Sequence, residues 1–325
     1  MMTRTPSPFI SVIIPTCGRP ELLLECVASV LRNDFTNFEV LIIDQDPARN
    51  LQVELSRRFP GDSRIIYLFL DTAGASTARN VGIKHARGEL IAFVDDDLEV
   101  APDWLRAYVD AFTSIQPPPG VVGGRVDPLW LSPRPDWFPE EKEYLLGLYD
   151  KGNELMPMIK GDLPFTANCA AQRRIIDEVG SLDERIGFSY ARKNCMLAGE
   201  DSLFAIKIQQ ANYSIYYQPR DRACHKIAKN KLTPKYFLKR NFWEGVTTMV
   251  VRYLSGTVTP AGVTSIIRCH IRAIAGQTWH AFFPKNIPRE KLPRDKAMML
   301  WASNCTYSLG IIYASLKLLW THKLP

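Results

Sequence analysis

Residues 71–97 read DTAGASTARNVGIKHARGELIAFVDDD, and the order of features in this stretch is informative. The segment 75–86 is predicted to be a helix, and the apolar run 90–94 is predicted to be a strand. Three consecutive aspartates, 95–97, follow that strand without a break. A helix that leads into a buried strand ending in acids is typical of an α/β protein.

The residues before this stretch repeat the alternation of strand and helix. Apolar, β-branched runs at 9–15, 38–43 and 64–70 are predicted strands, and 20–32 and 47–59 are predicted helices. Such alternation indicates βαβ units and a mostly parallel sheet. In a parallel sheet the ligand site lies beyond the carboxyl ends of the strands. The side chains expected there are Thr16, Asp44, Asp46 and the three acids at 95–97.

The three adjacent aspartates are the sharpest chemical signal in the chain. Neighbouring carboxylates repel one another and stay ionised only beside a cation or several hydrogen-bond donors. Oxygen ligands of this kind suit Mg²⁺ or Mn²⁺ bridging to a diphosphate. In an extended segment Asp95 and Asp97 share one face and Asp96 points away. The alternative is an acidic helix start, because Pro102 and Trp104 follow.

A basic side chain, Arg79, lies on the predicted helix that leads to these acids. Its planar guanidinium is suited to hold a nucleobase or a phosphate. The alternative is an arginine on the exposed face of a surface helix.

The composition excludes several classes of protein. Of 325 residues, 46 % are apolar and 23 % are charged, which excludes a disordered tail, a collagen-like fibre and a disulfide-stapled miniprotein. Seven scattered cysteines without a Cys-x-x-Cys pair argue against a zinc ribbon and favour a reducing compartment. The start, MMTRTPSPFI, lacks the features of a signal peptide, so a cytoplasmic location is expected.

The net charge of +6 conceals a gradient along the chain. Residues 1–201 carry 21 basic and 30 acidic side chains, whereas residues 202–325 carry 19 and 4. A basic face of this kind meets nucleic acid or an anionic membrane, and a merely solvated basic surface is the alternative.

The C-terminal region adds a second observation on the membrane. Residues 285–296 hold five basic and two acidic side chains, and an uncharged run follows at 297–316. The polar residues within that run argue against a spanning helix. A basic segment beside an amphipathic stretch is typical of attachment to the inner leaflet of a membrane. The alternative is a buried helix packed on the rest of the protein.

Several motifs occur in a fixed order along the chain. They are VIIPTCGRP (12–20), LIIDQD (41–46), the Gly-x-x-x-Ala-Arg-Asn segment (74–88), the Asp-x-Asp motif (95–97), FTANCAAQRRIIDEVGSLDE (165–184) and GEDSLFAIKI (199–208). This ordered set resembles the family 2 glycosyltransferases, whose fold is the GT-A type. The resemblance covers residues 9–228.

The resemblance implies which residues hold the donor nucleotide. Pro15, Thr16 and Asp44 look like contacts to the base, and Asp44 as acceptor of the uracil N3–H would favour a UDP-sugar. Arg79 is similar to the family's arginine near the base and phosphates. The chain departs from many relatives at 44–46, where it has Asp-Gln-Asp in place of Asp-Asp-x-Ser. This departure bears on base selectivity.

The resemblance also implies a metal site. Asp97 looks like the metal ligand, and Asp95 looks like a contact to the ribose and sugar that also faces the metal. Asp96 is grouped with the nucleotide-sugar contacts. Some relatives have a histidine at the position of His225 that meets the metal or the diphosphate, and a structural histidine is the alternative. The expected cofactor is Mn²⁺ or Mg²⁺.

A Glu-Asp pair completes the expected site. By resemblance Asp201 matches the catalytic base and Glu200 lies beside it for acceptor binding. One base, one metal and in-line displacement would invert the anomeric carbon of the sugar. The expected acceptor is a glycan or lipid-linked sugar in envelope polysaccharide synthesis, and no nucleic-acid partner is expected.

The domain organisation follows from these motifs. Seven prolines within 117–139 predict a long irregular connection. We expect a GT-A catalytic domain over 1–230, with a nucleotide-binding half at 9–115 and an acceptor half at 116–230. The region 231–325 is predicted to be a helical extension.

Two other functions compete with this interpretation. A nucleotidyltransferase would need a glycine-rich basic loop after the first strand, but VIIPTCGRP has one glycine and one arginine. A non-catalytic scaffold on membrane glycans would not need Asp95, Asp97 and Asp201 together.

Overall fold

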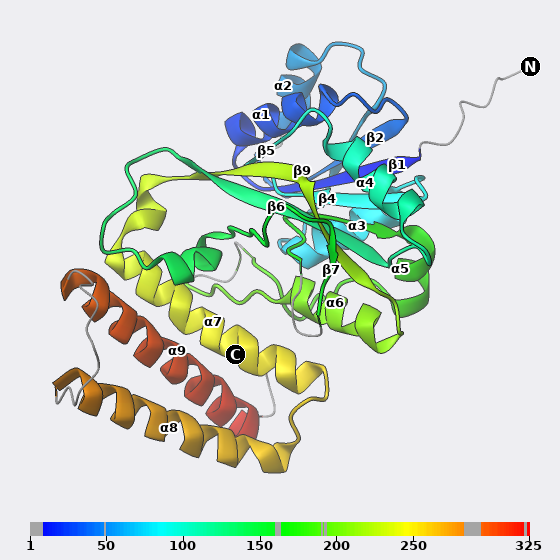
Figure 1. Ribbon diagram of the computed structural model, residues 1–325. Coiled ribbons are helices and arrows are strands. Elements are labelled where there is room, and N and C mark those ends of the chain that lie inside the picture. The colour runs from blue at the N-terminus through cyan, green and yellow to red at the C-terminus, as the bar shows by residue number, and fades with distance from the viewer. Residues whose placement is uncertain are drawn as a thin grey trace, which may run out of the picture. The chain divides into compact units, whose positions relative to one another are not determined.

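The computed structural model shows that contacts divide the chain into two units (Figure 1). The described residues are 9–48, 50–159, 164–189, 191, 194–282, 294–321 and 324–325. The first unit, called the sheet unit, comprises Met1–Pro128, Leu148–Arg192 and Glu200–Lys226. The second, called the helical unit, comprises Leu129–Gly147, Lys193–Gly199 and Ile227–Pro325.

The parallel half of the sheet has the strands that the sequence predicts. The strands are β1 (Ile10–Thr16), β2 (Phe38–Asp44), β3 (Ile65–Phe69) and β4 (Leu90–Val94). They lie side by side in the order β3-β2-β1-β4, and the three pairings between them are parallel. Every residue of β1, β2 and β4 is buried, which explains their continuous apolar runs. The predicted α/β class is confirmed.

Helices connect these strands and pack on the sheet. They are α1 (Pro20–Leu31), α2 (Leu51–Arg58), α3 (Ala75–His85) and α4 (Trp104–Ser114). α3 contacts β1 and β2, and Gly82 permits this approach because a Cβ there would clash with the side chain of Ile13. The alternative in which the three aspartates begin a helix is wrong, because β5 (Leu98–Val100) follows them.

The sheet continues beyond β4 with antiparallel strands. The further elements are β6 (Val121–Trp130), β7 (Met156–Pro157), β8 (Asn168–Gln172), β9 (Ile215–Ile227), α5 (Arg173–Val179) and α6 (Glu200–Gln210). Within the described residues the sheet has nine strands, in the order β3-β2-β1-β4-β8-β6-β9-β5, and β7 pairs with β9. The antiparallel β5–β9 pairing places Leu98 opposite His225.

The irregular connection predicted at 117–139 is wrong over much of its length. β6 occupies Val121–Trp130, and its first residues pair with β8 in the interior of the sheet. Two glycines within this strand allow close packing. A Cβ at Gly123 would clash with Pro164, and one at Gly124 with the backbone of Asp221. The prolines flank the buried part of the strand rather than interrupt it.

The helical unit confirms the predicted helices after Thr233. Its elements are η1 (Glu140–Leu146), η2 (Lys229–Leu232), α7 (Pro234–Leu254), α8 (Pro260–Phe282) and α9 (Arg294–Thr321). α9 packs against both α7 and α8 (Figure 1). At its crossing with α7 the backbones approach closely, because a Cβ at Gly245 or Gly310 would meet a main-chain carbonyl of the other helix.

The expected amphipathic stretch at 297–316 lies within α9. In the described part of the chain, none of the helices combines the length and the apolar character that crossing a bilayer requires. Of the basic segment 285–296, residues 285–293 lie outside the described residues.

Candidate active site

The ends of three parallel strands bring the predicted site residues to one edge of the sheet. β4 ends at Val94, and the acid triplet, defined as Asp95, Asp96 and Asp97, follows it. β1 lies beside β4 and ends at Thr16, which lies opposite Asp44 in the β1–β2 register. This is the edge at which parallel sheets bind ligands.

Asp96 is the buried member of the acid triplet, with no exposed surface. Thr16 Oγ1 donates a hydrogen bond to Asp96 Oδ2 at 2.7 Å, and Arg19 Nη2 lies 2.5 Å from Asp96 Oδ1. Burial raises the pKa of Asp96 to about 7, although the charge of Arg19 and the Thr16 hydroxyl act in the opposite direction. Asp96 therefore faces inward and ties the end of β4 to the end of β1.

Asp97 collects two nitrogen partners on one oxygen. Arg19 Nη1 lies 3.1 Å from Asp97 Oδ2, and His225 Nε2 lies 3.2 Å from the same atom. His225 reaches this point because β9 pairs with β5, directly after the acid triplet. A backbone hydrogen bond also links the two segments, since the Lys226 amide donates to the Asp97 carbonyl at 3.1 Å.

These groups suit a divalent cation that is shared with a substrate. The carboxylate of Asp97 is a ligand that suits both Mn²⁺ and Mg²⁺, whereas the imidazole of His225 is a softer ligand that suits Mn²⁺ better than Mg²⁺. Within the described ranges, no three His, Cys, Asp or Glu side chains are grouped so as to hold a metal ion. Asp97 and His225 could supply two ligands to such a cation, and a diphosphate and water would have to supply the others.

Arg79 joins the acid triplet to helix α6. Its Nη2 lies 2.7 Å from Asp95 Oδ1, and its Nη1 lies 2.9 Å from Glu200 Oε1. The Arg79 side chain is 5 % exposed. Burial acts to lower the pKa of Arg79, but the carboxylates of Asp95 and Glu200 outweigh it and hold that pKa above its usual range. Arg79 is thus a charged bridge inside the protein.

The predicted Glu-Asp pair begins helix α6. Glu200 is buried, and its Oε2 has no hydrogen-bond partner among the described residues. Asp201 is partly exposed, and its Oδ1 accepts a hydrogen bond from the Ser202 amide at 2.7 Å. Two carboxylates at a helix N-terminus are stabilised by the helix dipole. Through Arg79 this pair is held next to the acid triplet.

A small cavity lies beside the strand ends. Its volume is about 100 Å³, and its lining includes Thr16, Arg19, Asp44, Asp46 and Asn50. The Tyr67 hydroxyl donates to Asp44 Oδ2 at 2.9 Å, and the Asp46 amide donates to Asp44 Oδ1 at 2.9 Å. Burial raises the pKa of Asp44, while these two hydrogen bonds lower it. Pro15, the residue before Thr16, is buried within β1.

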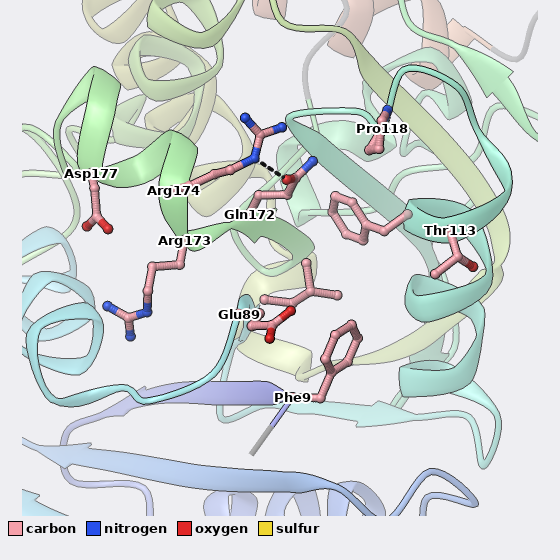
Figure 2. A pocket seen from close by; sticks show the side chains of 10 residues that line it. Phe9, Glu89, Thr113, Pro118, Gln172, Arg173, Arg174 and Asp177 are labelled. Atoms are coloured by element: carbon pink, nitrogen blue, oxygen red, sulfur yellow. Dashed lines mark hydrogen bonds between the residues drawn. The ribbon is translucent and has the colours of Figure 1, made fainter. Parts of the chain in front are cut away.

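A second cavity lies at the opposite ends of the parallel strands (Figure 2). It has a volume of about 490 Å³, and Phe9, Glu89 and Phe112 contribute to its lining. Its arginines have partners, since Arg173 donates to the Gly88 carbonyl and Arg174 donates to Gln172. None of the residues predicted for the site lines this cavity.

Sequence reasoning missed two residues that contact the predicted site. Arg19 lies in the quoted motif VIIPTCGRP, and a basic residue between a strand end and a helix start was the available signal. Tyr67 lies on β3, where its hydroxyl reaches Asp44 on the neighbouring strand. Nothing in the apolar run 64–70 distinguishes this tyrosine before the sheet register is known.

Comparison with known proteins agrees with this geometry. Residues 11–179 match the family described as Glycosyl transferase family 2. The chain belongs to this family. The match covers the strand ends at Thr16 and Asp44, Arg79 and the whole acid triplet. The resemblance drawn from the motifs is confirmed, and the chain is an enzyme of the glycosyltransferase class.

Individual relatives have related names. A glucosyl-dolichyl phosphate glucuronosyltransferase of Haloferax volcanii is 26 % identical over 249 residues, covering 75 % of this chain and 78 % of the relative. The putative colanic acid biosynthesis glycosyl transferase WcaA of Escherichia coli is 36 % identical over 104 residues. This match covers 32 % of the present chain and 37 % of WcaA.

A solved structure supports the fold. The mannosyltransferase PcManGT from Pyrobaculum calidifontis, in complex with GDP-Man and Mn²⁺, superposes with a TM-score of 0.60. The alignment covers 97 % of this chain and 88 % of that one, with 16 % sequence identity. This likeness confirms the expected GT-A fold.

Proposed function

We propose that this glycosyltransferase is an inverting, metal-dependent enzyme that moves a sugar from a nucleotide-sugar to a hydroxyl of a glycan or lipid-linked acceptor. The observation that carries the proposal is the Arg79 bridge, which joins Asp95 of the acid triplet to Glu200 of α6. It brings the residues proposed for the donor next to those proposed for the acceptor.

On the donor side, Asp97 and His225 hold the cation and Asp95 faces the ribose and sugar. Asp95 is the most exposed of the three acids, with a side chain that is 33 % exposed, so it is accessible to a ligand. When bound, Mn²⁺ or Mg²⁺ offsets the negative charge that develops on the departing diphosphate. The buried Asp96 does not face the donor but holds Thr16 and Arg19 in place behind the proposed cation site.

The base of the nucleotide is proposed to lie in the small cavity, with Thr16 and Asp44 as its contacts. Both oxygens of Asp44 already accept a hydrogen bond, and each retains a lone pair for a ring N–H. Uracil offers one such N–H, so a UDP-sugar is the proposed donor. The solved structure of PcManGT contains GDP-Man, and GDP-sugars are therefore the comparison that the experiment must include.

On the acceptor side, Asp201 is the proposed base. The acceptor oxygen forms a bond to the anomeric carbon, the bond from that carbon to the diphosphate oxygen breaks, and the proton passes to the Asp201 carboxylate. A positioned base contributes about 10²–10⁴-fold in rate. Glu200 Oε2, buried and without a partner among the described residues, is a suitable acceptor for a sugar hydroxyl.

The experiment that tests this function uses donor hydrolysis. UDP- and GDP-sugars are incubated with the protein and Mn²⁺, first alone and then with lipid extracts and glycans as acceptors. We expect hydrolysis of a UDP-sugar by the parent protein. Asp97→Asn should lose metal-dependent UDP binding, and Asp201→Asn should keep binding but lose transfer by tenfold or more. Full transfer by Asp201→Asn would exclude Asp201 as the base.

The helical unit is proposed to attach the enzyme to an anionic membrane surface, on the inner face of the cell membrane. α9 presents an apolar face, since Met298, Leu309, Tyr313 and Trp320 are between 42 % and 79 % exposed and recur at helical spacing. α8 has no acidic residue, and Arg268 and Arg272 are exposed one turn apart. Apolar and basic side chains together suit the membrane interface.

Vesicle sedimentation tests this attachment. The full chain should sediment with vesicles that contain an anionic lipid and be partly released by salt, because charge attraction is screened over about 8–10 Å at physiological ionic strength. Trp320→Ser with Leu309→Ser should weaken the part of the binding that salt does not remove. Sedimentation that is equal with neutral and anionic vesicles would contradict the electrostatic part of the proposal.

A further inference from the structure

Arg19 lies where two sets of charges meet. It stands between the end of β1 and Pro20, the first residue of α1. Its guanidinium spans Asp96 at 2.5 Å and Asp97 at 3.1 Å. The same side chain lines the small cavity proposed for the base. Arg19 therefore lies between the proposed base site and the proposed cation site.

The two ends of this guanidinium are held in different surroundings. Nη2 pairs with Asp96, whose side chain has no exposed surface. Nη1 pairs with Asp97, which is 9 % exposed, and the Arg19 side chain itself is 33 % exposed. The contact to the fully buried Asp96 is costly to give up, because this carboxylate would keep only the Thr16 hydroxyl and lose its cationic partner. Nη1 is consequently the end that can change partners.

The contact of Nη1 conflicts with cation binding. Asp97 Oδ2 receives both Arg19 Nη1 and His225 Nε2. This oxygen and His225 Nε2, 3.2 Å apart, are the two atoms that would bind a shared cation. A guanidinium 3.1 Å from that oxygen and a divalent cation on it repel each other. Arg19 and the cation thus compete for one atom.

We propose that Arg19 is a counter-ion that exchanges partners. Before the donor arrives it balances the charge of Asp97. When a divalent cation takes Asp97, Nη1 turns to the diphosphate of the donor while Nη2 remains on Asp96. A planar guanidinium is suited to phosphate oxygens, and Asp96 holds it in place for them. The inference rests on the proposed function, because its ligand is a nucleoside diphosphate.

The exchange predicts opposite effects on two ligands. Arg19→Gln removes the competing charge, so the affinity for Mn²⁺ alone should rise by about tenfold, by the Coulomb repulsion between neighbouring cations. The affinity for UDP or GDP at saturating Mn²⁺ should fall by about tenfold, because one charged contact to the phosphates is lost. If Arg19 only supported the fold, its replacement would weaken the binding of both Mn²⁺ and the nucleoside diphosphate.

The experiment measures Mn²⁺ by the electron paramagnetic resonance of the free ion and the nucleoside diphosphates by calorimetry. Arg64→Gln is the matched control, because Arg64 is 31 % exposed and pairs with one aspartate, Asp62, outside the site. It should change neither affinity. Arg19→Lys keeps the charge, so its Mn²⁺ affinity should stay within about threefold of the parent's.

The outcomes separate this inference from the proposed function. If the parent binds neither Mn²⁺ nor a nucleoside diphosphate, the proposed function is wrong. If the parent binds both and Arg19→Gln weakens both, or Arg19→Lys gains Mn²⁺ affinity as Arg19→Gln does, the exchange of partners is wrong. A gain for Mn²⁺ together with a loss for the diphosphate supports it.

Discussion

Replacing Arg79 with methionine should destabilise the sheet unit through the carboxylates it leaves behind. Methionine has a long unbranched side chain, so the volume is largely kept and the charge is removed. Asp95 and Glu200 then lose the guanidinium that pairs with each of them at 2.7 and 2.9 Å. Asp95 directly follows β4 and Glu200 begins α6, so the link between these two elements is lost as well.

Most of the lost stability comes from leaving the Glu200 carboxylate without its ion-pair partner. The Glu200 side chain is 8 % exposed, and one of its oxygens has no other partner among the described residues, whereas Asp95 is 33 % exposed and can be hydrated. Removing one member of a buried ion pair typically costs about 3–5 kcal/mol. We expect about 3 kcal/mol here, because Asp95 recovers part of its hydration. For a unit of this size that corresponds to a fall of about 6–12 °C in melting temperature.

Differential scanning calorimetry of parent and variant measures this effect as a shift in melting temperature. The double variant Arg79→Met with Glu200→Gln should recover at least half of the loss, because no buried charge is left unpaired. Arg220→Met is the matched control. Arg220 pairs with Asp110, both side chains are about half exposed, and its loss should cost less than about 1 kcal/mol.

A shift of Arg79→Met no larger than that of the control would refute the buried bridge. The affinity for UDP distinguishes a role of Arg79 in nucleotide binding from a structural role. If Arg79 contacts the nucleotide, as the resemblance implies, Arg79→Lys should bind UDP more weakly while its melting temperature changes little. If the bridge is its main role, the losses of stability and of binding should rise together across the variants.

Two further predictions concern stability. Asp221 has no exposed surface and neither carboxylate oxygen has a partner among the described residues, and burial raises its pKa well above the usual range. Stability should therefore decline as pH rises above about 4, the unfolded pKa, and Asp221→Asn should flatten this decline and gain about 1–3 kcal/mol at pH 8 in urea denaturation. In the helical unit, Gly310→Ala should cost about 1–3 kcal/mol because the new methyl group meets the Phe242 carbonyl, whereas Gly276→Ala, with open space around it, should gain up to about 1 kcal/mol from helix propensity. A melting temperature that rises equally in both glycine variants would contradict the close crossing of α7 and α9.

The edge at which the site residues gather was predictable from the sequence, and the reason is the geometry of parallel strands. Each buried strand appears as an apolar run, and the polar residue that ends it must lie at the carboxyl edge. Thr16, Asp44 and the acid triplet could therefore be placed together before any coordinates were known. The link to Glu200 depended on the family resemblance, because α6 is more than a hundred residues further along the chain.

The features that the sequence did not predict, strand β6 and the role of Arg19, depend on contacts between distant segments of the chain. β6 contains two glycines and a proline, which predict a loop in isolation, but its glycines are required by the neighbours Pro164 and Asp221. Such packing overrides local propensity. Arg19 was missed for a similar reason, since its partners follow β4, almost eighty residues away.

The division of the acid triplet shows why three consecutive aspartates can persist in a folded protein. Each carboxylate has cationic or hydrogen-bonding partners, and Arg19 is shared by two of them: Asp95 pairs with Arg79, Asp96 with Arg19 and Thr16, and Asp97 with Arg19 and His225. The repulsion among the three acids is therefore offset by protein groups before any metal ion is considered. A cation at the proposed site would therefore have to displace Arg19 from Asp97 alone, the carboxylate that Arg19 and His225 both contact.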